Sequence, residues 1–233
     1  MDLVELKKEQ MKLAAKIVLR DGFTTVKTLG GIDCIAHGNE LIAAVVVCGF
    51  PSMKLLEAKT YSLADPFRYV PGFQAYREMP AMIEAYNQLE QEPDLLIVSG
   101  AGIAHPRRIG IAAHLGLALN KATIGVAETL LVGQVQQGKI MFENEIAGFE
   151  IRTREHSNPI YVSPGHLVSL GSVLHIIPQT IQYPHKMPEP LHLAHKVARK
   201  KGKGEKLMAE EAVIPENISL GGESDGLTAG IKN

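Results

Sequence analysis

Residues 94–127 read DLLIVSGAGIAHPRRIGIAAHLGLALNKATIGVA. The apolar run at 94–98 predicts a short strand, and the glycine-rich turn at 100–102 connects it to a helix predicted over 108–119. A second apolar run at 123–127 predicts a further strand. Strands that alternate with helices in this way predict an α/β sheet.

Upstream of this stretch, three β-like runs follow one another and predict a meander. The second of them is almost wholly apolar, which suits a strand that is covered on both faces of the sheet. Helical spacing and turn signals predict the remaining elements. The upstream strands are expected at 29–36, 41–50 and 54–63, the other helices at 2–20, 74–91, 168–177 and 191–201, and the later strands as a hairpin within 133–154 and a short strand at 160–163.

The order of these elements, a meander followed by alternating helices and strands, predicts a mixed α/β sheet with helices on both faces. This pattern matches the ribonuclease H-like architecture. Residues 1–201 are expected to form one domain. Residues 202–233 contain glycine-rich runs with few large apolar side chains, which predict a disordered C-terminal tail.

The composition limits the classes of function. The chain has 233 residues, of which 45 % are hydrophobic, and a formal net charge of −1, so it has no global basic field. No apolar run approaches the roughly 20 residues that a membrane-spanning helix needs, and the N-terminus has no apolar signal region. A cytoplasmic protein without membrane attachment is therefore expected. A nucleic-acid-binding protein of this charge would need its cations on one face, and Arg107-Arg108 and the basic run 196–203 are the candidates.

Three motifs stand in a fixed order along the chain. They are Tyr69-Val70-Pro71-Gly72-Phe73 with Arg77-Glu78 after it, Gly102-Ile103-Ala104-His105-Pro106-Arg107, and Pro188-Glu189-Pro190-Leu191-His192-Leu193-Ala194-His195. In this order they resemble the endonuclease V family, nucleases that nick nucleic acid near deaminated bases, chiefly hypoxanthine (inosine). The resemblance covers residues 1–200. It implies a ribonuclease H-like fold, a pocket for the deaminated base and a Mg²⁺-dependent nick in a nearby phosphodiester.

Two carboxylates are the candidate metal ligands. Asp33 lies in an otherwise apolar strand, where a charge is expensive unless a metal ion or a donor pairs it; a simple strand-end aspartate is the alternative. Glu78 lies in the first turns of a predicted helix, where a lone glutamate usually just faces solvent. The resemblance implies that both bind Mg²⁺ or Mn²⁺, which activates a water and stabilises the leaving oxygen.

Three positions depart from the family pattern at the chemical centre. Ser99 stands where the family has a third carboxylate, and a serine brings no charge. A unit charge about 4 Å from the metal contributes roughly 4 kcal/mol to metal binding per unit of metal charge, before desolvation and at an effective dielectric of ~20. Glu128 stands where the family usually has a lysine close to the scissile phosphate, and Ala101 replaces a common histidine. Either Glu128 supplies the carboxylate that Ser99 lacks, or an anion now repels the phosphate. The second interpretation, weakened activity, is preferred.

The positions around the base match the family better. Tyr69 and Pro71 match the wedge that takes over the stacking lost when a base leaves the helix. Gly72, Gly100 and Gly102 match turns whose backbone amides approach the extruded base, which glycine permits because it lacks a Cβ. Taken singly, each glycine could equally mark an ordinary turn.

Histidines complete the predicted site. His105 matches the active-site histidine of the family, although a loop histidine is more often structural. His195 matches a position near the metal. His166 matches a loop motif or simply orders its loop. His192 lies three residues before His195, so a two-histidine metal site is a weaker alternative.

The sequence therefore predicts an endonuclease V-like protein that recognises inosine in DNA or RNA and cleaves nearby, with activity weakened by Ser99 and Glu128. The alternative is a catalytically inactive protein that binds inosine-containing nucleic acid; a diverged relative with another substrate is a weaker one. The run 196–203 would contact phosphates, which gives affinity without sequence choice, or would only solubilise the surface. No motif indicates an oligomer, so a monomer is expected.

Overall fold

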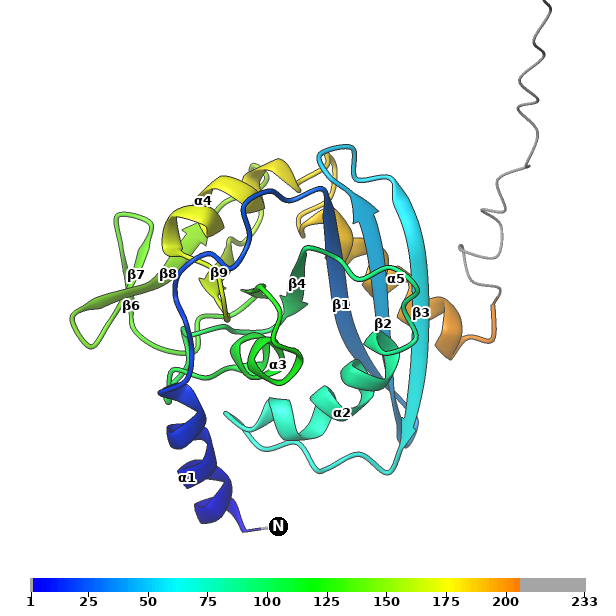
Figure 1. Cartoon of the computed structure of the whole chain (residues 1–233), viewed down its shortest axis with the longest axis horizontal. Coiled ribbons are helices and arrows are strands. Elements are labelled where there is room, and N and C mark those ends of the chain that lie inside the picture. The colour runs from blue at the N-terminus through cyan, green and yellow to red at the C-terminus, as the bar shows by residue number, and fades with distance from the viewer. Residues whose placement is uncertain (1, 206–233) are drawn as a thin grey trace, which may run out of the picture.

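A mixed β-sheet with helices on both faces organises the computed structural model, which describes residues 2–205 (Figure 1). The strands are β1 (Thr28–His37), β2 (Glu40–Gly49), β3 (Leu55–Ala64), β4 (Leu95–Ser99), β5 (Thr123–Ala127), β6 (Gln134–Gln136), β7 (Lys139–Phe142), β8 (Glu145–Ile151) and β9 (Ile160–Pro164). The helices are α1 (Leu3–Ala14), α2 (Gln74–Tyr86), α3 (Ile111–Leu119), α4 (Leu170–Gln179) and α5 (Glu189–Gly202). The predicted α/β class is confirmed.

The strand order places β1 between its antiparallel neighbour β2 and its parallel neighbour β4. Across the described residues the sheet runs β3-β2-β1-β4-β5-β9-β8-β7-β6. β1 to β3 form the predicted antiparallel meander, while β1 with β4 and β4 with β5 pair in parallel. The register sets Ile32 opposite Val98 and Ser99 opposite Val126. The carboxyl ends of β4 and β5 therefore meet beside the middle of β1, the kind of place where open α/β sheets bind ligands.

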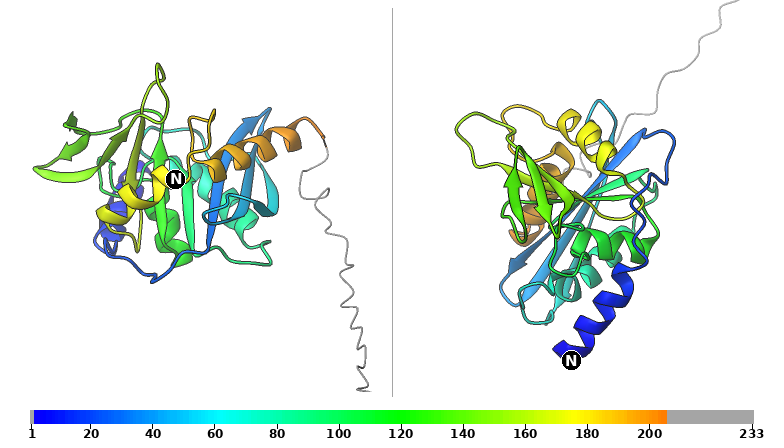
Figure 2. Two further views of the ribbon diagram at one scale, coloured as in Figure 1. Left: turned by 90° about the horizontal axis from the view of Figure 1, so that it is seen from above. Right: turned by 90° about the vertical axis from the view of Figure 1, so that its left-hand side faces the viewer.

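Helices cover both faces of the sheet, as Figure 2 shows from two further directions. On one face, Val45 of β2 belongs to the same buried cluster as Met82 of α2 and Leu115 of α3. On the other face, Val46 of β2 belongs to a cluster with Val197 of α5. Because β2 is enclosed from both sides, eight consecutive residues of it are buried, as its apolar sequence predicts.

Several predicted boundaries move in the structure. The N-terminal helix ends at Ala14 instead of residue 20, and the helix expected from residue 108 begins at Ile111. The expected hairpin within 133–154 comprises three strands, of which β8 joins the body of the sheet beside β9. The buried side chains of Ala147 and Phe149 explain this, because they give β8 an apolar face to cover.

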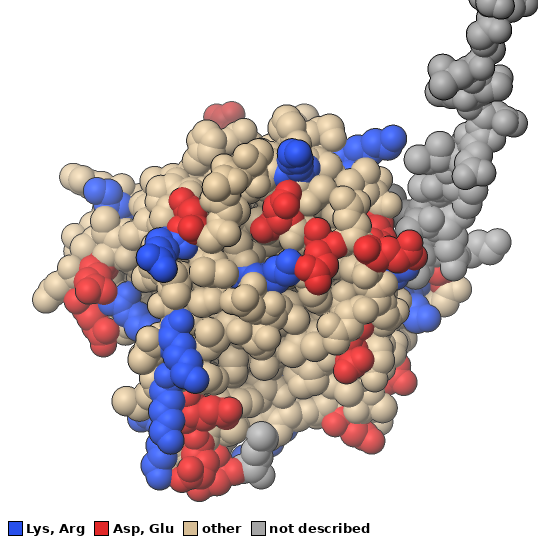
Figure 3. Space-filling model, in the orientation of Figure 1, with Lys and Arg blue, Asp and Glu red and all other residues tan. Residues whose placement is uncertain are grey.

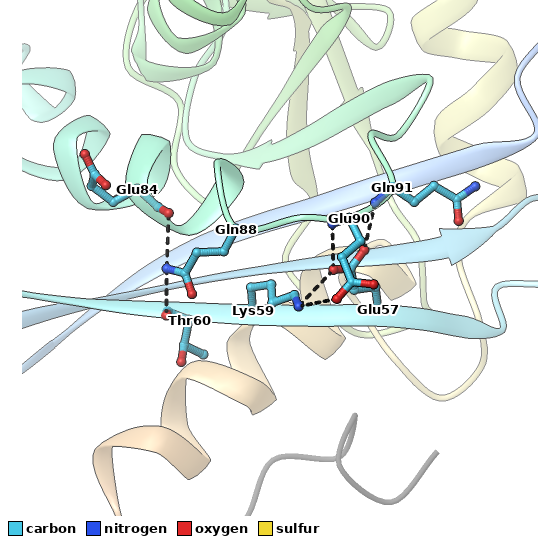
Figure 4. A network of polar contacts seen from close by, with 7 residues as sticks. All are labelled: Glu57, Lys59, Thr60, Glu84, Gln88, Glu90 and Gln91. Atoms are coloured by element: carbon cyan, nitrogen blue, oxygen red, sulfur yellow. Dashed lines mark hydrogen bonds and ion pairs between the residues drawn. The ribbon is translucent and has the colours of Figure 1, made fainter. Parts of the chain in front are cut away.

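A polar network explains why α2 ends at Tyr86, short of the predicted residue 91 (Figure 4). The Glu57 carboxylate on β3 accepts hydrogen bonds from the backbone amides of Glu90 and Gln91. Lys59 Nζ lies 3.3 Å from a carboxylate oxygen of both Glu57 and Glu90. These contacts fasten the segment after α2 to the edge strand, so its backbone donors are satisfied outside a helix.

Two further expectations concern the ends of the chain and the membrane. None of the helices between residues 2 and 205 combines the length and the apolar character needed to cross a bilayer. Of the expected disordered tail, residues 202–205 form the end of α5 and the turn after it, and residues 206–233 fall outside the described residues. The domain boundary at residue 201 stays a prediction.

A glycine on β1 lets α5 approach the sheet. A Cβ built on Gly31 would lie 2.1 Å from the carbonyl oxygen of Pro190 and 2.7 Å from its Cβ, at the start of α5. The carbonyl belongs to the backbone, so it can move aside only if the helix moves. The missing side chain at Gly31 therefore sets how closely β1 and α5 pack.

Gly31→Ala should lower the free energy of unfolding by about 1–3 kcal/mol, the usual cost of overpacking, and urea denaturation would measure it. The matched control is Gly171→Ala in α4, where the nearest contact of an added Cβ is the Ser169 Oγ at 3.8 Å. The control should be neutral or slightly stabilising, because alanine is the better helix former. Equal losses in both variants would contradict the packing argument.

Candidate active site

A cavity of about 500 Å³ opens where β4 and β5 end beside β1. We call it the acid cavity. Its wall includes residues from the middle of β1, from the ends of β4 and β5, and from α5 with the loop before it. They include Asp33, Ser99, Glu128, Met187, His192 and His195. Four of the predicted catalytic residues, Asp33, Ser99, Glu128 and His195, are thus brought to one place.

Asp33 is buried and already has a hydrogen-bonded partner. Its Oδ2 lies 2.8 Å from Nδ1 of His195 on α5, and the Asp33 residue is 8 % exposed. The hydrogen bond to Asp33 raises the pKa of His195, and partial burial opposes that rise. The hydrogen-bonded imidazole therefore gives the Asp33 carboxylate a partner, which explains how an acid survives in an apolar strand.

Glu78 lies on α2, within electrostatic reach of Asp33 but outside the wall of the acid cavity. Burial raises the pKa of Glu78 to about 7, the Asp33 charge adds to the rise, and a hydrogen bond from Gln74 opposes it. The Gln74 Nε2 donates to Glu78 Oε2 at 2.9 Å. The two predicted metal ligands therefore lie near each other, and Glu78 is only partly ionised at neutral pH.

Ser99 and Glu128, two of the three positions expected to depart from the family pattern, differ in their surroundings. Ser99 is half-buried at the end of β4 and contributes no charge. The Glu128 side chain is 63 % exposed, and its Oε1 accepts a hydrogen bond from Lys186 Nζ at 2.9 Å. Glu128 is thus engaged by a cation at the mouth of the acid cavity, which argues against its acting as the replacement carboxylate.

The donor set fits a divalent ion held by few protein ligands. Between residues 2 and 205 no three or more His, Cys, Asp or Glu side chains are gathered closely enough to hold a metal ion. Mg²⁺ is commonly bound through one or two carboxylates, with waters and substrate phosphates completing its coordination. Asp33 and Glu78 meet that minimum. The two-histidine alternative gains no support, because His192 stacks on His185 with ring centroids 3.6 Å apart.

A second, smaller cavity of about 40 Å³ is lined in part by Gln74, and we call it the Tyr69 cavity. Its wall includes Gln10, Tyr69, Gly72, Gln74, His105 and Leu131. Tyr69 is 65 % exposed at its edge, as a stacking wedge must be. Pro71 is exposed but lines neither cavity.

The carbonyl oxygen of Gly72 organises one wall of the Tyr69 cavity. It accepts hydrogen bonds from Nε2 of Gln10 at 3.2 Å, from Nε2 of His105 at 3.1 Å and from the guanidinium of Arg107. Arg107 also lies over the Phe73 ring, 4.5 Å from its centroid. Gly72 itself has φ +76°, which is strained for any residue with a Cβ.

His105 supports this wall and is uncharged. Burial lowers its pKa to about 4, and the neighbouring Arg107 charge contributes. Its Nδ1 accepts a hydrogen bond from the Arg107 amide, so Nε2 carries the proton that is donated to Gly72. Both ring nitrogens are therefore occupied, and His105 lines the Tyr69 cavity instead of standing beside the acids. The geometry favours the structural alternative over proton transfer.

The other two predicted base-contacting glycines use their amides within the protein. The Gly100 amide donates to the Val126 carbonyl at 2.8 Å, and the Gly102 amide donates to Ser163 Oγ at 2.9 Å. Neither glycine lines the Tyr69 cavity, whereas Ala101 between them does. Of the three glycines, Gly72 lines the Tyr69 cavity, Gly100 lines the acid cavity and Gly102 lines neither.

Sequence reasoning missed several residues that build these sites. Gln10 is 1 % exposed, and the available signal was a polar residue on the buried face of an amphipathic helix. Lys186 gave no signal. Arg107 and Arg108, expected as a phosphate-binding pair, hold protein groups instead: Arg107 binds Gly72, and Arg108 pairs with Glu145 at 2.7 Å. His166 accepts from the Val18 amide and so orders its loop.

Glu78→Gln should change how stability depends on pH. The pKa of Glu78 is about 7 in the folded protein against 4.5 for the free side chain, so the folded state holds the extra proton and wild-type stability falls as pH rises through this window. The variant should exceed wild type by on the order of 2 kcal/mol above about pH 8, and the difference should vanish below about pH 4. Urea denaturation across pH measures it. Exposed Glu84→Gln on the same helix is the control, and a pH-independent difference for Glu78→Gln would contradict the assignment.

Comparisons with known proteins identify the family of this chain. The family model for endonuclease V matches residues 11–196. Endonuclease V of Dictyoglomus turgidum is 38 % identical over 199 residues, covering 82 % of this chain and 87 % of the relative, and that of Rippkaea orientalis is 37 % identical over 210 residues, covering 86 % and 91 %.

Solved structures extend the comparison to the fold. Endonuclease V of Ciona intestinalis, in complex with a 24mer DNA containing an inosine followed by a ribo-adenosine, has a TM-score of 0.79 at 26 % identity over 87 % of this chain and 98 % of that one. The Bacillus subtilis endonuclease V also gives 0.79 at 26 %, over 88 % and 93 %. These neighbours have a ribonuclease H-like fold, which confirms that prediction, and nucleases of this family generally depend on a divalent metal. The chain belongs to the endonuclease V family.

Proposed function

We propose that the protein recognises a deaminated purine, with inosine as the defining case, in DNA or RNA and cleaves a nearby phosphodiester slowly in a Mg²⁺- or Mn²⁺-dependent reaction. The observation that carries the proposal is the position of Gln74. It lines the Tyr69 cavity and donates to Glu78, the acid beside Asp33. A base stacked against Tyr69 at the mouth of this cavity would therefore place its own backbone close to the two acids.

Recognition would depend on the Tyr69 cavity. An extruded purine would enter beside the Gly72 wall, and the exposed ring of Tyr69 would replace the stacking that the base leaves behind. The wall is neutral at His105 and held by internal hydrogen bonds. Preorganised walls lower the cost of ordering on binding.

Cleavage would depend on Asp33 and Glu78 as holders of the divalent ion, which when bound supplies an activated water and neutralises charge on the leaving oxygen. Glu78 must be ionised for this role. Ser99 contributes a hydroxyl but no charge. Glu128 adds an anion at the cavity mouth, partly offset by Lys186. Both features support weakened activity.

A second candidate is a protein that binds inosine-containing nucleic acid without cleaving it. It is favoured because two carboxylates of the acid cavity already have partners within the protein: Asp33 pairs with His195, and Glu128 pairs with Lys186. The two candidates share the Tyr69 cavity and differ only at the acid cavity. Binding and nicking must therefore be scored separately on the same substrate.

Ser99→Asp should raise nicking of a single-inosine DNA or RNA strand in Mg²⁺ or Mn²⁺ by at least about tenfold, because one added charge near a metal contributes a few kcal/mol. Gel-resolved product and anisotropy binding would be measured together. The control Ser99→Asn has similar volume and no charge. Binding with no cleavage by either wild type or Ser99→Asp would sink the nuclease proposal and leave the binding protein.

Tyr69→Ala should weaken binding of an inosine-containing strand by about tenfold or more, since stacking of a base on an aromatic ring contributes ~1–3 kcal/mol. Tyr69→Phe keeps the ring and should bind as wild type. The measurement is the affinity for strands that differ only in inosine or guanosine. Unchanged affinity in Tyr69→Ala would remove the wedge role.

A further inference from the structure

The outer face of α5 carries a row of cations that continues the acid cavity. Lys196, Arg199, Lys200 and Lys203, which we call the α5 ridge, follow the spacing i, i+3, i+4 and i+7 and therefore lie on one face of the helix and its C-cap. They line an open groove of about 370 Å³. His192 and His195 line this groove and the acid cavity alike, so the two hollows are contiguous.

The charges of the ridge are directed outward. The opposite side of α5 is buried against the sheet through Ala194, Val197 and Ala198. Among the described residues, no ion pair engages Lys196, Arg199 or Lys200, and Lys203 has only a long contact of 3.8 Å with Glu205. The groove therefore holds several cations whose charge the described protein leaves largely uncompensated.

The helix dipole explains only part of this row. Cations in a last turn interact favourably with the carbonyls at the helix end, and this accounts for Arg199 and Lys200. Lys196 lies before the last turn, close to the acid cavity, and the dipole gives it no reason to be there. The dipole also does not explain why the row begins at the edge of that cavity.

The opposite face of the molecule gives a contrast. Figure 3 shows the side covered by α2 and α3, where blue and red side chains are interspersed and the one row of cations, along α1, has acidic side chains beside it. Lys8 on α1, for example, pairs with Glu5 at 2.8 Å. In Figure 2, α5 lies across the other side of the sheet.

We propose that the α5 ridge binds the phosphate backbone of the nucleic-acid strand as it leaves the acid cavity. The inference rests on the proposed function and adds the direction of the strand. From Lys196 to Lys203 the helix rises about 10 Å, which spans roughly three phosphates at the ~3.4 Å axial spacing of one duplex strand. Such contacts fix the register of the strand and supply affinity, but they do not choose the base.

The test is the salt dependence of binding by Lys196→Gln/Lys200→Gln, measured by anisotropy on an inosine-containing oligonucleotide without divalent metal. Glutamine keeps helix propensity, and Arg199 is left intact because its charge acts on His195. The slope of log affinity against log salt should shrink by about 1.8 for a duplex or about 1.4 for a single strand. The preference for inosine over guanosine should stay unchanged.

The matched control is Lys27→Gln/Lys54→Gln, which removes the same charge elsewhere. Both lysines are exposed, and Lys27 lies six residues before Asp33 along an extended strand, about 20 Å away. The control should keep the wild-type slope. An equal change of the salt slope in both double variants, or an unchanged slope in the ridge variant, would overturn the proposal that the ridge binds phosphates. If the wild type bound inosine-containing and guanosine-containing strands equally well, the proposed function would fail. The salt slope would still report whether the ridge binds phosphates.

Substrates with an arm on only one side of the inosine give a second measurement. The ridge lies on one side of the acid cavity, so the ridge variant should lose affinity for one arm and bind the other as wild type does. Equal losses of affinity for both arms would show that the ridge attracts nucleic acid without a defined path, which would contradict the proposed direction of the strand.

Discussion

The pairing of Asp33 with His195 across β1 and α5 is the interaction on which the candidate active site depends. A carboxylate beneath a packed helix needs a partner, because an unpaired buried charge is strongly destabilising. His195 provides it at 2.8 Å, and the helix can come that close because Gly31 presents no side chain to Pro190. The same docking closes one wall of the acid cavity and turns the cations of α5 outward.

Recognition and chemistry rest on different physics in this protein. One wall of the Tyr69 cavity is held by internal hydrogen bonds from Gln10, His105 and the Arg107 guanidinium, with the Gly72 carbonyl as their common acceptor. In the proposed function the acid cavity works through charge, where Ser99 contributes none and Glu128 contributes an anion held by Lys186. The proposed weakening of the chemistry would therefore leave the walls of the other cavity intact.

Much of the fold could be predicted from local sequence. The apolar run of β2 required cover on both sides and has it, and the meander, β4, β5 and α5 lie close to their predicted positions. Asp33 and Glu78 could be singled out because one is a charge in an apolar strand and the other sits in a distinctive motif. The roles of His105 and Gly102 could not, since each depends on hydrogen bonds to residues distant in the chain.

The sequence by itself determined the element types and the set of polar residues that occur in apolar surroundings, because these follow from composition and spacing along the chain, and its motifs carried the resemblance to the family. Only the tertiary structure decided partners and protonation. Gln10 meets Gly72 across 62 residues, and Glu128 meets Lys186 across 58. Burial sets the pKa of His105 and Glu78 in opposite directions, since it disfavours whichever form is charged. Burial and long-range contact exist only once the chain has packed, so no local pattern can encode them.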